Sequence, residues 1–285
     1  MSDLTDKPSI SQVVHGGRIL LIDLFGQLMN LIVAEEREVK NIGEDRLLPL
    51  EGESQGNAIS VRALRTSIII LQFGVLEALA NFIAEVTIQI HCGATGAPRV
   101  TNPLTQVELD LLKEQRTLLD TRTGELRIQQ PVYQSILDKL AVVPLLFARA
   151  YGLNFRLDKS VSGWNKIARL KELRDALTHI RLDCRPSLSA EIDNSDLDRV
   201  RPSLTISSRD LFSGSEAIIW YGQQIKQVCI KMSIPEYKVI SKLMVFVEFF
   251  GYMQLINLHS SCGITKEEFT RMYPMKHFKY RAKTA

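Results

Sequence analysis

Apolar residues recur every three to four positions along almost the whole chain, and few stretches alternate with a period of two. Spacing of three and four residues is that of amphipathic helices, whereas strict alternation is that of strands. The pattern therefore predicts an all-α fold, a helical bundle with long loops.

Seven helices are predicted, over residues 17–40, 60–91, 106–120, 131–151, 163–183, 208–232 and 235–258. Thr105 and Glu108 form a capping-box pattern at the start of the third, and residues 203–207 read as a short strand. The first helix is expected to present as its apolar side Ile19, Leu20, Ile22, Leu24, Leu28, Ile32 and Val33. We expect a single helical domain over residues 10–260 and a basic C-terminal tail over 261–285.

Two stretches, 67–90 and 239–258, are apolar enough to suggest a membrane. Each also holds side chains that are costly at bilayer depth, among them Glu77 and Glu85 in the first and Lys242 and Glu248 in the second. We therefore expect buried helices of a soluble bundle and no membrane partner. The acids near the N-terminus do not suit a secretory signal, so a cytoplasmic protein is expected.

The composition is that of a globular protein, with 45% hydrophobic and 24% charged residues, and the formal net charge is +3. A charge this small does not suit a protein that coats nucleic acid, so any contact with RNA is expected to be local. The sequence lacks phosphate-binding and dinucleotide-binding glycine loops, the Gly-x-Ser-x-Gly elbow, the His-Glu-x-x-His zinc helix and zinc-type cysteine spacing. We expect no metal and no cofactor.

The chemically informative stretch is residues 171–181. On a helix its apolar residues gather on one side, which predicts that they face the core: Leu170, Leu173, Leu177 and Ile180. Lys171, Asp175 and Thr178 lie on the opposite side. Arg174 and His179 flank that polar face, about 140° apart around the axis and about 7.5 Å apart along it, and so can bracket a group lying across it.

Arg174-Asp175-x-x-x-His179 resembles the Arg-x4-His signature of the HEPN superfamily of helical domains. The stretch from Phe73 to Ile83 is similar to an early helix of such domains, in which polar residues, here Glu77 and Asn81, interrupt an apolar face. The resemblance implies a metal-independent endoribonuclease, acting as a homodimer whose two motifs form one cleft. It also implies a role such as toxin or antiviral effector.

Under this interpretation His179 transfers protons and Arg174 binds the scissile phosphate. Asp175 and Thr178 orient either the imidazole of His179 or the side chain of Arg174. Lys171 and Arg181 would contribute to a basic RNA-binding groove. The alternatives are a solvated helix face with an incidental histidine, a non-catalytic module that binds a nucleotide, RNA or partner protein, and a purely structural bundle. An inhibitor or partner protein is a further expectation of the enzyme hypothesis.

Two other features leave alternatives open. Glu77 and Asn81, four residues apart, either hydrogen-bond the Arg174 helix or lie at the surface. Residues 271–283 carry five lysines and arginines and no acids, with Tyr273 among interleaved aromatic residues. This tail either contacts RNA through its charges and rings or is a basic disordered end.

Overall fold

The computed structural model describes residues 9–42, 55–96, 99–114, 116–119, 123, 126–129, 134–178, 206–232 and 238–274. The described helices are α1 (Ile10–Ile42), α2 (Gln55–His91), α3 (Gln106–Leu112), α4 (Ile136–Arg149), α5 (Ser162–Thr178), α7 (Ser208–Met232), α8 (Lys238–Leu258) and α9 (Lys266–Met272). Two short strands, β1 (Arg116–Leu119) and β2 (Leu126–Gln129), form an antiparallel hairpin in which Leu119 pairs with Leu126. The predicted all-α bundle is confirmed, with this hairpin as an addition.

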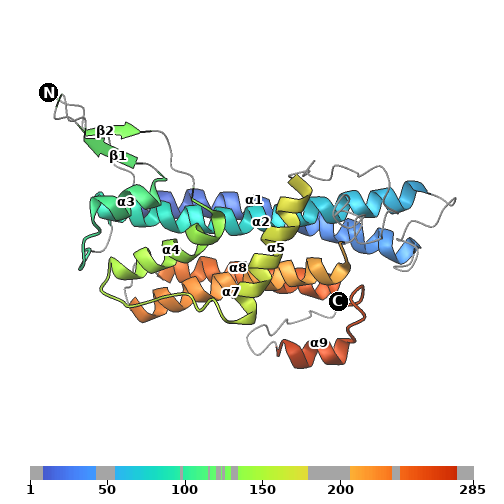
Figure 1. Cartoon of the computed structure of the whole chain (residues 1–285). Coiled ribbons are helices and arrows are strands. Elements are labelled where there is room, and N and C mark those ends of the chain that lie inside the picture. Colours follow the sequence, from blue (N-terminus) through green and yellow to red (C-terminus); the bar gives the residue numbers. More distant parts are fainter. Residues whose placement is uncertain are drawn as a thin grey trace.

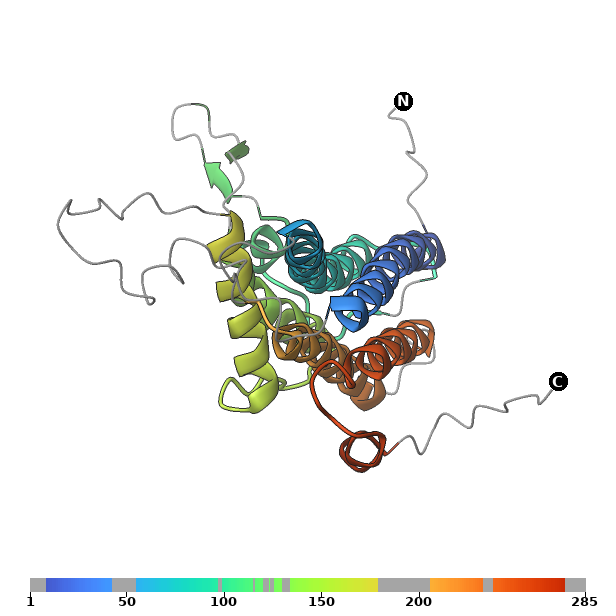
Figure 2. The same ribbon diagram turned by 90° about the vertical axis from the view of Figure 1, so that its right-hand side faces the viewer.

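Four long helices make two layers (Figure 1). Helices α1 and α2 lie side by side above α7 and α8, and α4 packs between the layers at one end. Helix α5 stands steeply across one side of the bundle, where it contacts both α2 and α7 (Figure 2). One continuous core fills the space between the layers, and its largest fully buried side chains include Phe25, Phe73, Phe147 and Tyr221.

The boundaries of several helices follow the prediction and others do not. Helix α7 and the ends of α2 and α8 lie where the sequence places them, while α1 and α2 begin seven and five residues early. Helix α4 begins at Ile136 rather than Pro131, because the Ser135 hydroxyl caps it by accepting a hydrogen bond from the backbone of Asp138. Pro144 lies inside α4 without dividing it. Residues 206 and 207 are not in a strand, and 179–183 and 203–205 lie outside the described residues.

The predicted helix 106–120 is wrong in its second half. Its start is correct, since Thr105 and Glu108 form the expected capping box. The helix ends at Leu112, and Glu114 then adopts a positive φ of 51°, which turns the chain out of the helix toward β1. Strand β2 begins seven residues after β1 ends, close enough to pair with it as a hairpin. Residues 116–119 therefore form a strand in place of the last turns of the predicted helix.

The predicted apolar side of α1 is also partly wrong. Leu28 and Ile32 are buried and Leu24 is half-buried, but Ile19, Leu20, Ile22 and Val33 are exposed. The residues that α1 buries instead are Val14, Leu21, Phe25, Leu28, Ile32, Glu35 and Val39. These recur at steps of three, four and seven, which is the spacing of a single seam against neighbouring helices. A second apolar surface on α1 is therefore left outside the core.

By length and composition alone, two described stretches could cross a membrane, Ile10–Asn41 and Val61–His91. The two stretches differ in burial. In Val61–His91, 61% of the most apolar part is buried inside the protein, whereas in Ile10–Asn41 only 22% is. Burial of the second matches the predicted core helix. The low burial of the first agrees with the exposed apolar residues of α1.

The beginning of the predicted tail is folded onto the bundle. Helix α9 starts at the Thr265 capping box and buries Phe269. Tyr273 stacks with Phe269 at 5.2 Å between ring centroids and donates a hydrogen bond to Glu216 of α7. The ring of Tyr273 is thus occupied by packing instead of presented for base stacking. Residues 275–285 lie outside the described part of the chain.

Candidate functional site: the polar face of α5

Helix α5 is held against the bundle by its apolar side. Ile167, Leu170 and Leu173 are buried, and Leu177 is half-buried. At its start Gly163 lies so close to Trp220 of α7 that a Cβ atom would be 2.2 Å from the indole ring. A glycine is therefore required where the two helices meet. This packing sets the direction in which the opposite, polar face of α5 points.

Ion pairs fix α5 along α7. The Lys166 ammonium lies 2.7 Å from a carboxylate oxygen of Glu216, the same residue that accepts the Tyr273 hydroxyl. Arg169 approaches Asp210, near the start of α7, at 3.6 Å. These contacts reinforce the apolar packing, so the next two turns of α5 have a defined position.

The predicted polar face contains a three-residue charge cluster. Asp175 accepts a hydrogen bond from Lys171, one turn earlier, at 2.5 Å, and another from Nη1 of Arg174 at 2.8 Å. All three side chains are about one-third exposed. The carboxylate thus holds both cations in place while leaving them accessible to solvent.

Asp175 is an anion at neutral pH. Its partial burial acts to raise the pKa, but the hydrogen bonds and charges of Lys171 and Arg174 outweigh that effect and lower the pKa below the usual value. Because the carboxylate stays ionised, it can orient Arg174 over the whole physiological pH range.

The second support of Arg174 comes from α2. Its guanidinium carbon lies 4.8 Å from the centroid of the Phe73 ring, within the range of a cation–π contact. Phe73 is almost fully buried, so its ring provides a rigid platform. Sequence reasoning included Phe73 in the stretch that resembles the early helix but gave it no part in the site, because 101 residues separate it from Arg174.

The remaining members of the motif lie near the end of the described helix. Thr178 is exposed, and its hydroxyl donates to the Arg174 carbonyl at 2.9 Å, a bond within the helix. His179 and Arg181 lie outside the described residues, as does Ile180. Their predicted roles remain predictions.

Glu77 and Asn81 do not join this cluster by hydrogen bonds to the described part of α5. Glu77 is half-buried and Asn81 is exposed. Asn81 instead lines an open hollow of about 490 Å³ between α2, α3 and α4. That hollow contains a buried cation, Lys139, paired with Glu114 at 2.9 Å. Asn81 therefore lines a different surface from the one that carries Arg174, and no described contact assigns Glu77 to either.

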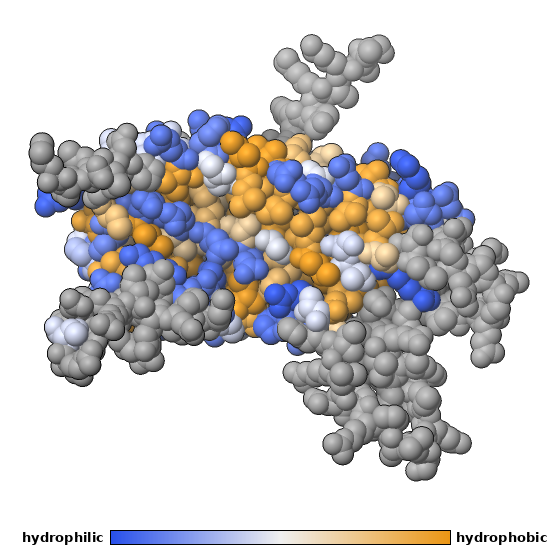
Figure 3. Space-filling view, turned by 90° about the horizontal axis from the view of Figure 1, so that it is seen from above, coloured by the Kyte–Doolittle hydropathy of each residue, from blue (hydrophilic) through white to orange (hydrophobic). Residues whose placement is uncertain are grey.

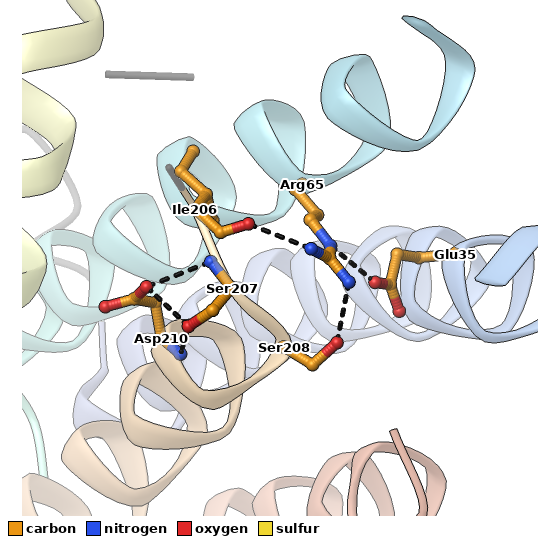
Figure 4. Close-up of polar contacts among 6 residues, drawn as sticks. All are labelled: Glu35, Arg65, Ile206, Ser207, Ser208 and Asp210. Carbon is orange, nitrogen blue, oxygen red and sulfur yellow. Dashed lines mark hydrogen bonds and ion pairs between the residues drawn. The ribbon is translucent and has the colours of Figure 1, made fainter. Parts of the chain in front are cut away.

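A buried charge network absent from the sequence prediction lies at the start of α7 (Figure 4). Arg65 of α2 donates to Glu35 of α1 at 2.7 Å, to the Ile206 carbonyl at 2.9 Å and to the Ser208 hydroxyl at 2.7 Å. Asp210 meanwhile accepts from Ser207 at the first turn of α7. The network ties two long helices to the point where the described chain resumes after residue 205. It is shielded from solvent and serves as a structural anchor.

No protein-family model, curated protein or solved structure matches the chain. The similarity to the HEPN superfamily therefore remains a resemblance between sequences. Within the residues that the structure describes, no three His, Cys, Asp or Glu side chains are grouped so that they could hold a metal ion. The surface that combines a predicted functional motif with organised charge is the polar face of α5.

Proposed function

We propose that this protein is a metal-independent endoribonuclease of the HEPN type, acting in the cytoplasm as a homodimer. The observation that carries the proposal is the position of Arg174. Its guanidinium is held by Asp175 and by the Phe73 ring, yet remains one-third exposed, five residues before His179.

Arg174 is suited to bind the scissile phosphate. A guanidinium has five N–H donors in a planar fork, and here one nitrogen, Nη1, bonds to Asp175. The other donors can take two phosphate oxygens in a bidentate contact. Lys171 adds a second positive charge one turn away, and Arg181 would extend the basic surface.

His179 would move the protons. RNA carries its own nucleophile, the 2'-hydroxyl, whose oxygen attacks the adjacent phosphorus as its proton leaves to a base. The bond from phosphorus to the 5'-oxygen then breaks, and that oxygen takes a proton, leaving a 2',3'-cyclic phosphate. Imidazole suits this exchange because its ordinary pKa lies near neutrality.

The test is cleavage of total cellular RNA by the purified protein in EDTA, with the fragment ends sequenced. We expect wild type to leave 2',3'-cyclic phosphates. Arg174→Ala and His179→Ala should each lower the rate by at least about a hundredfold, since each removes a group that acts on the reacting phosphate. Arg99→Ala, at an exposed arginine in the segment between α2 and α3, is the matched control and should cleave normally.

Unchanged cleavage by both motif variants would contradict the proposal, and so would a strict requirement for magnesium. Tight RNA binding without any cleavage would favour the non-catalytic binding module instead. A role as a toxin or antiviral effector predicts that expression arrests growth only with Arg174 and His179 intact. A partner protein that relieves the arrest would be the expected inhibitor.

A further inference from the structure

An apolar face covers the outward side of α1 and reaches α2. Ile19 and Leu20 are 56% and 53% exposed, and Ile22 and Val33 of α1 and Ile70 of α2 are 40% exposed or more. Seen from above these helices, a broad, mostly apolar band, interrupted by hydrophilic residues, runs along the molecule (Figure 3). The core takes the other side of α1, so the described part of the chain leaves this band uncovered.

Helical glycines give a second, independent indication of a missing neighbour. Gly17, Gly163, Gly214, Gly222 and Gly251 each have a side chain from another helix where a Cβ would lie, so the fold itself requires them. Three other helical glycines have nothing within 4 Å of that position: Gly16 and Gly26 of α1 and Gly74 of α2. Glycine weakens a helix interior, and these three have no compensating contact within the described chain. All three belong to the upper layer of α1 and α2.

On α1 one apolar pair, Ile19 and Val33, is placed symmetrically about Gly26. At about 100° per residue, Ile19, Ile22, Gly26 and Val33 fall within about 60° of one another around the axis. Ile19 lies seven residues before Gly26 and Val33 seven residues after it. If two α1 helices cross in antiparallel fashion at Gly26, Ile19 of each copy meets Val33 of the other.

We propose that the α1–α2 face is a homodimer interface, in which the α1 helices of two copies cross at Gly26. An isologous interface needs a surface that is complementary to itself under a two-fold rotation, and the Ile19, Gly26 and Val33 stripe meets this condition. The absence of a side chain at Gly26 allows close approach of the two backbones at the axis.

The face is large enough for a stable dimer. Helix α1 has 33 residues and is therefore about 50 Å long. Together with the adjoining side of α2 it offers a strip about 20 Å wide, or about 1,000 Å². A standard protein–protein interface buries about 800 Å² on each partner.

Polar residues within the face favour a protein partner over a lipid surface. The Asp23 carboxylate lies beside the apolar stripe and accepts a hydrogen bond from Gln27 at 2.9 Å. A carboxylate and an amide at this place are costly in hydrocarbon and gain nothing from anionic headgroups. Protein interfaces accommodate such polar groups routinely.

This interface does not depend on RNA cleavage. In Figure 2, α1 lies toward one side of the bundle and α5 toward the other. A dimer through α1 therefore keeps the two Arg174 residues apart. In this homodimer each Arg174 acts on RNA within its own protomer, instead of in the shared cleft that the sequence resemblance implies. Loss of the dimer and loss of cleavage can be measured separately.

The test is sedimentation equilibrium of the full-length protein with a paired set of variants. Ile19→Lys and Val33→Glu each place a charge against an apolar partner, twice in each dimer. We expect each alone to raise the dimer dissociation constant by at least about tenfold. Combined in one chain, they set the introduced lysine of each copy against the introduced glutamate of the other, so the double variant should regain dimerisation. Val107→Lys, at a 70% exposed apolar residue of α3, is the matched control and should dimerise as wild type.

Circular dichroism of every variant confirms that the helices are retained, which the exposure of both positions leads us to expect. A wild type that is monomeric at about 100 μM would overturn the proposal. So would dimers that persist in both single variants, or a double variant as monomeric as the singles. If the monomeric wild type instead bound vesicles of neutral or anionic lipid, the face would be a membrane surface and the proposal would be wrong.

Discussion

At the scale of single residues, the buried pair of Arg65 and Glu35 is the most consequential contact outside the core. Both side chains are at least about nine-tenths buried, and removing one partner leaves the other charged in a site closed to water. We expect Arg65→Met to lower the free energy of unfolding by about 3–5 kcal/mol, measured by urea denaturation at pH 7. Lys40→Met, which removes a pair with Glu36 whose lysine is 65% exposed, should cost under about 0.5 kcal/mol.

A double variant, Arg65→Met with Glu35→Leu, removes both charges and so distinguishes the loss of the ion pair from the cost of leaving one charge buried. It should be more stable than Arg65→Met alone, because it no longer holds a buried carboxylate from which Arg65 has been removed. Equal losses for Arg65→Met and Lys40→Met would show that the network is not buried in solution. The sequence does not reveal this pair, because 30 residues separate its members and both stand in otherwise ordinary helical patterns.

At the scale of an element, α3 depends on its cap. The Thr105 hydroxyl accepts from the backbone of Glu108, whose carboxylate bonds in return to the backbone and hydroxyl of Thr105. Thr105→Ala should therefore lower the free energy of unfolding by about 1 kcal/mol. Ser67→Ala, an exposed helical serine that bonds only within its own helix, is the control and should change it by less than about 0.5 kcal/mol.

The effect of the cap should also depend on pH. Partial burial acts to raise the pKa of Glu108, but hydrogen bonds from Thr105 and the nearby charge of Arg149 outweigh it and hold the pKa below 4.5. The folded form thus favours the carboxylate. Its contribution is complete above pH 4.5 and is lost as the pH falls through the lower folded value. The difference between wild type and Thr105→Ala should shrink from pH 7 to pH 3, and a constant difference would contradict this account.

The elements also show how far local pattern determines the fold and the site. Helix α7 and the end of α2 follow from apolar spacing and from the glycine-containing stretch after His91, both local signals. The hairpin does not, since Leu118 and Leu119 fit a helical pattern and only their pairing with residues 126–129 selects a strand. The charged face of α5 is likewise local, whereas its Phe73 platform arises from packing between distant segments.

At the scale of the whole molecule, a buried polar chain links both layers. Gln72 of α2 donates to the Leu211 carbonyl and to the Ser215 hydroxyl of α7, and Ser215 donates to Gln254 of α8. Gly214 is required because a Cβ there would lie 2.1 Å from the Gln72 side chain. These bonds fix the relative register of three core helices, so we expect α2, α7 and α8 to open only together.

Helix α9 stands outside that unit and should open independently. It has seven residues, and it is held through Phe269, its stacking with Tyr273, and the bond from Tyr273 to Glu216. In hydrogen exchange followed by mass spectrometry, Phe269→Ala should accelerate exchange in residues 260–274 and leave α2 and α7 as protected as in wild type. Phe147→Ala, a fully buried change in α4, should instead lower protection throughout, with a loss of about 3–5 kcal/mol in global stability. If Phe269→Ala also weakened protection in α2 and α7, α9 would belong to the same cooperative unit as those helices. The independent opening of α9 would then be wrong.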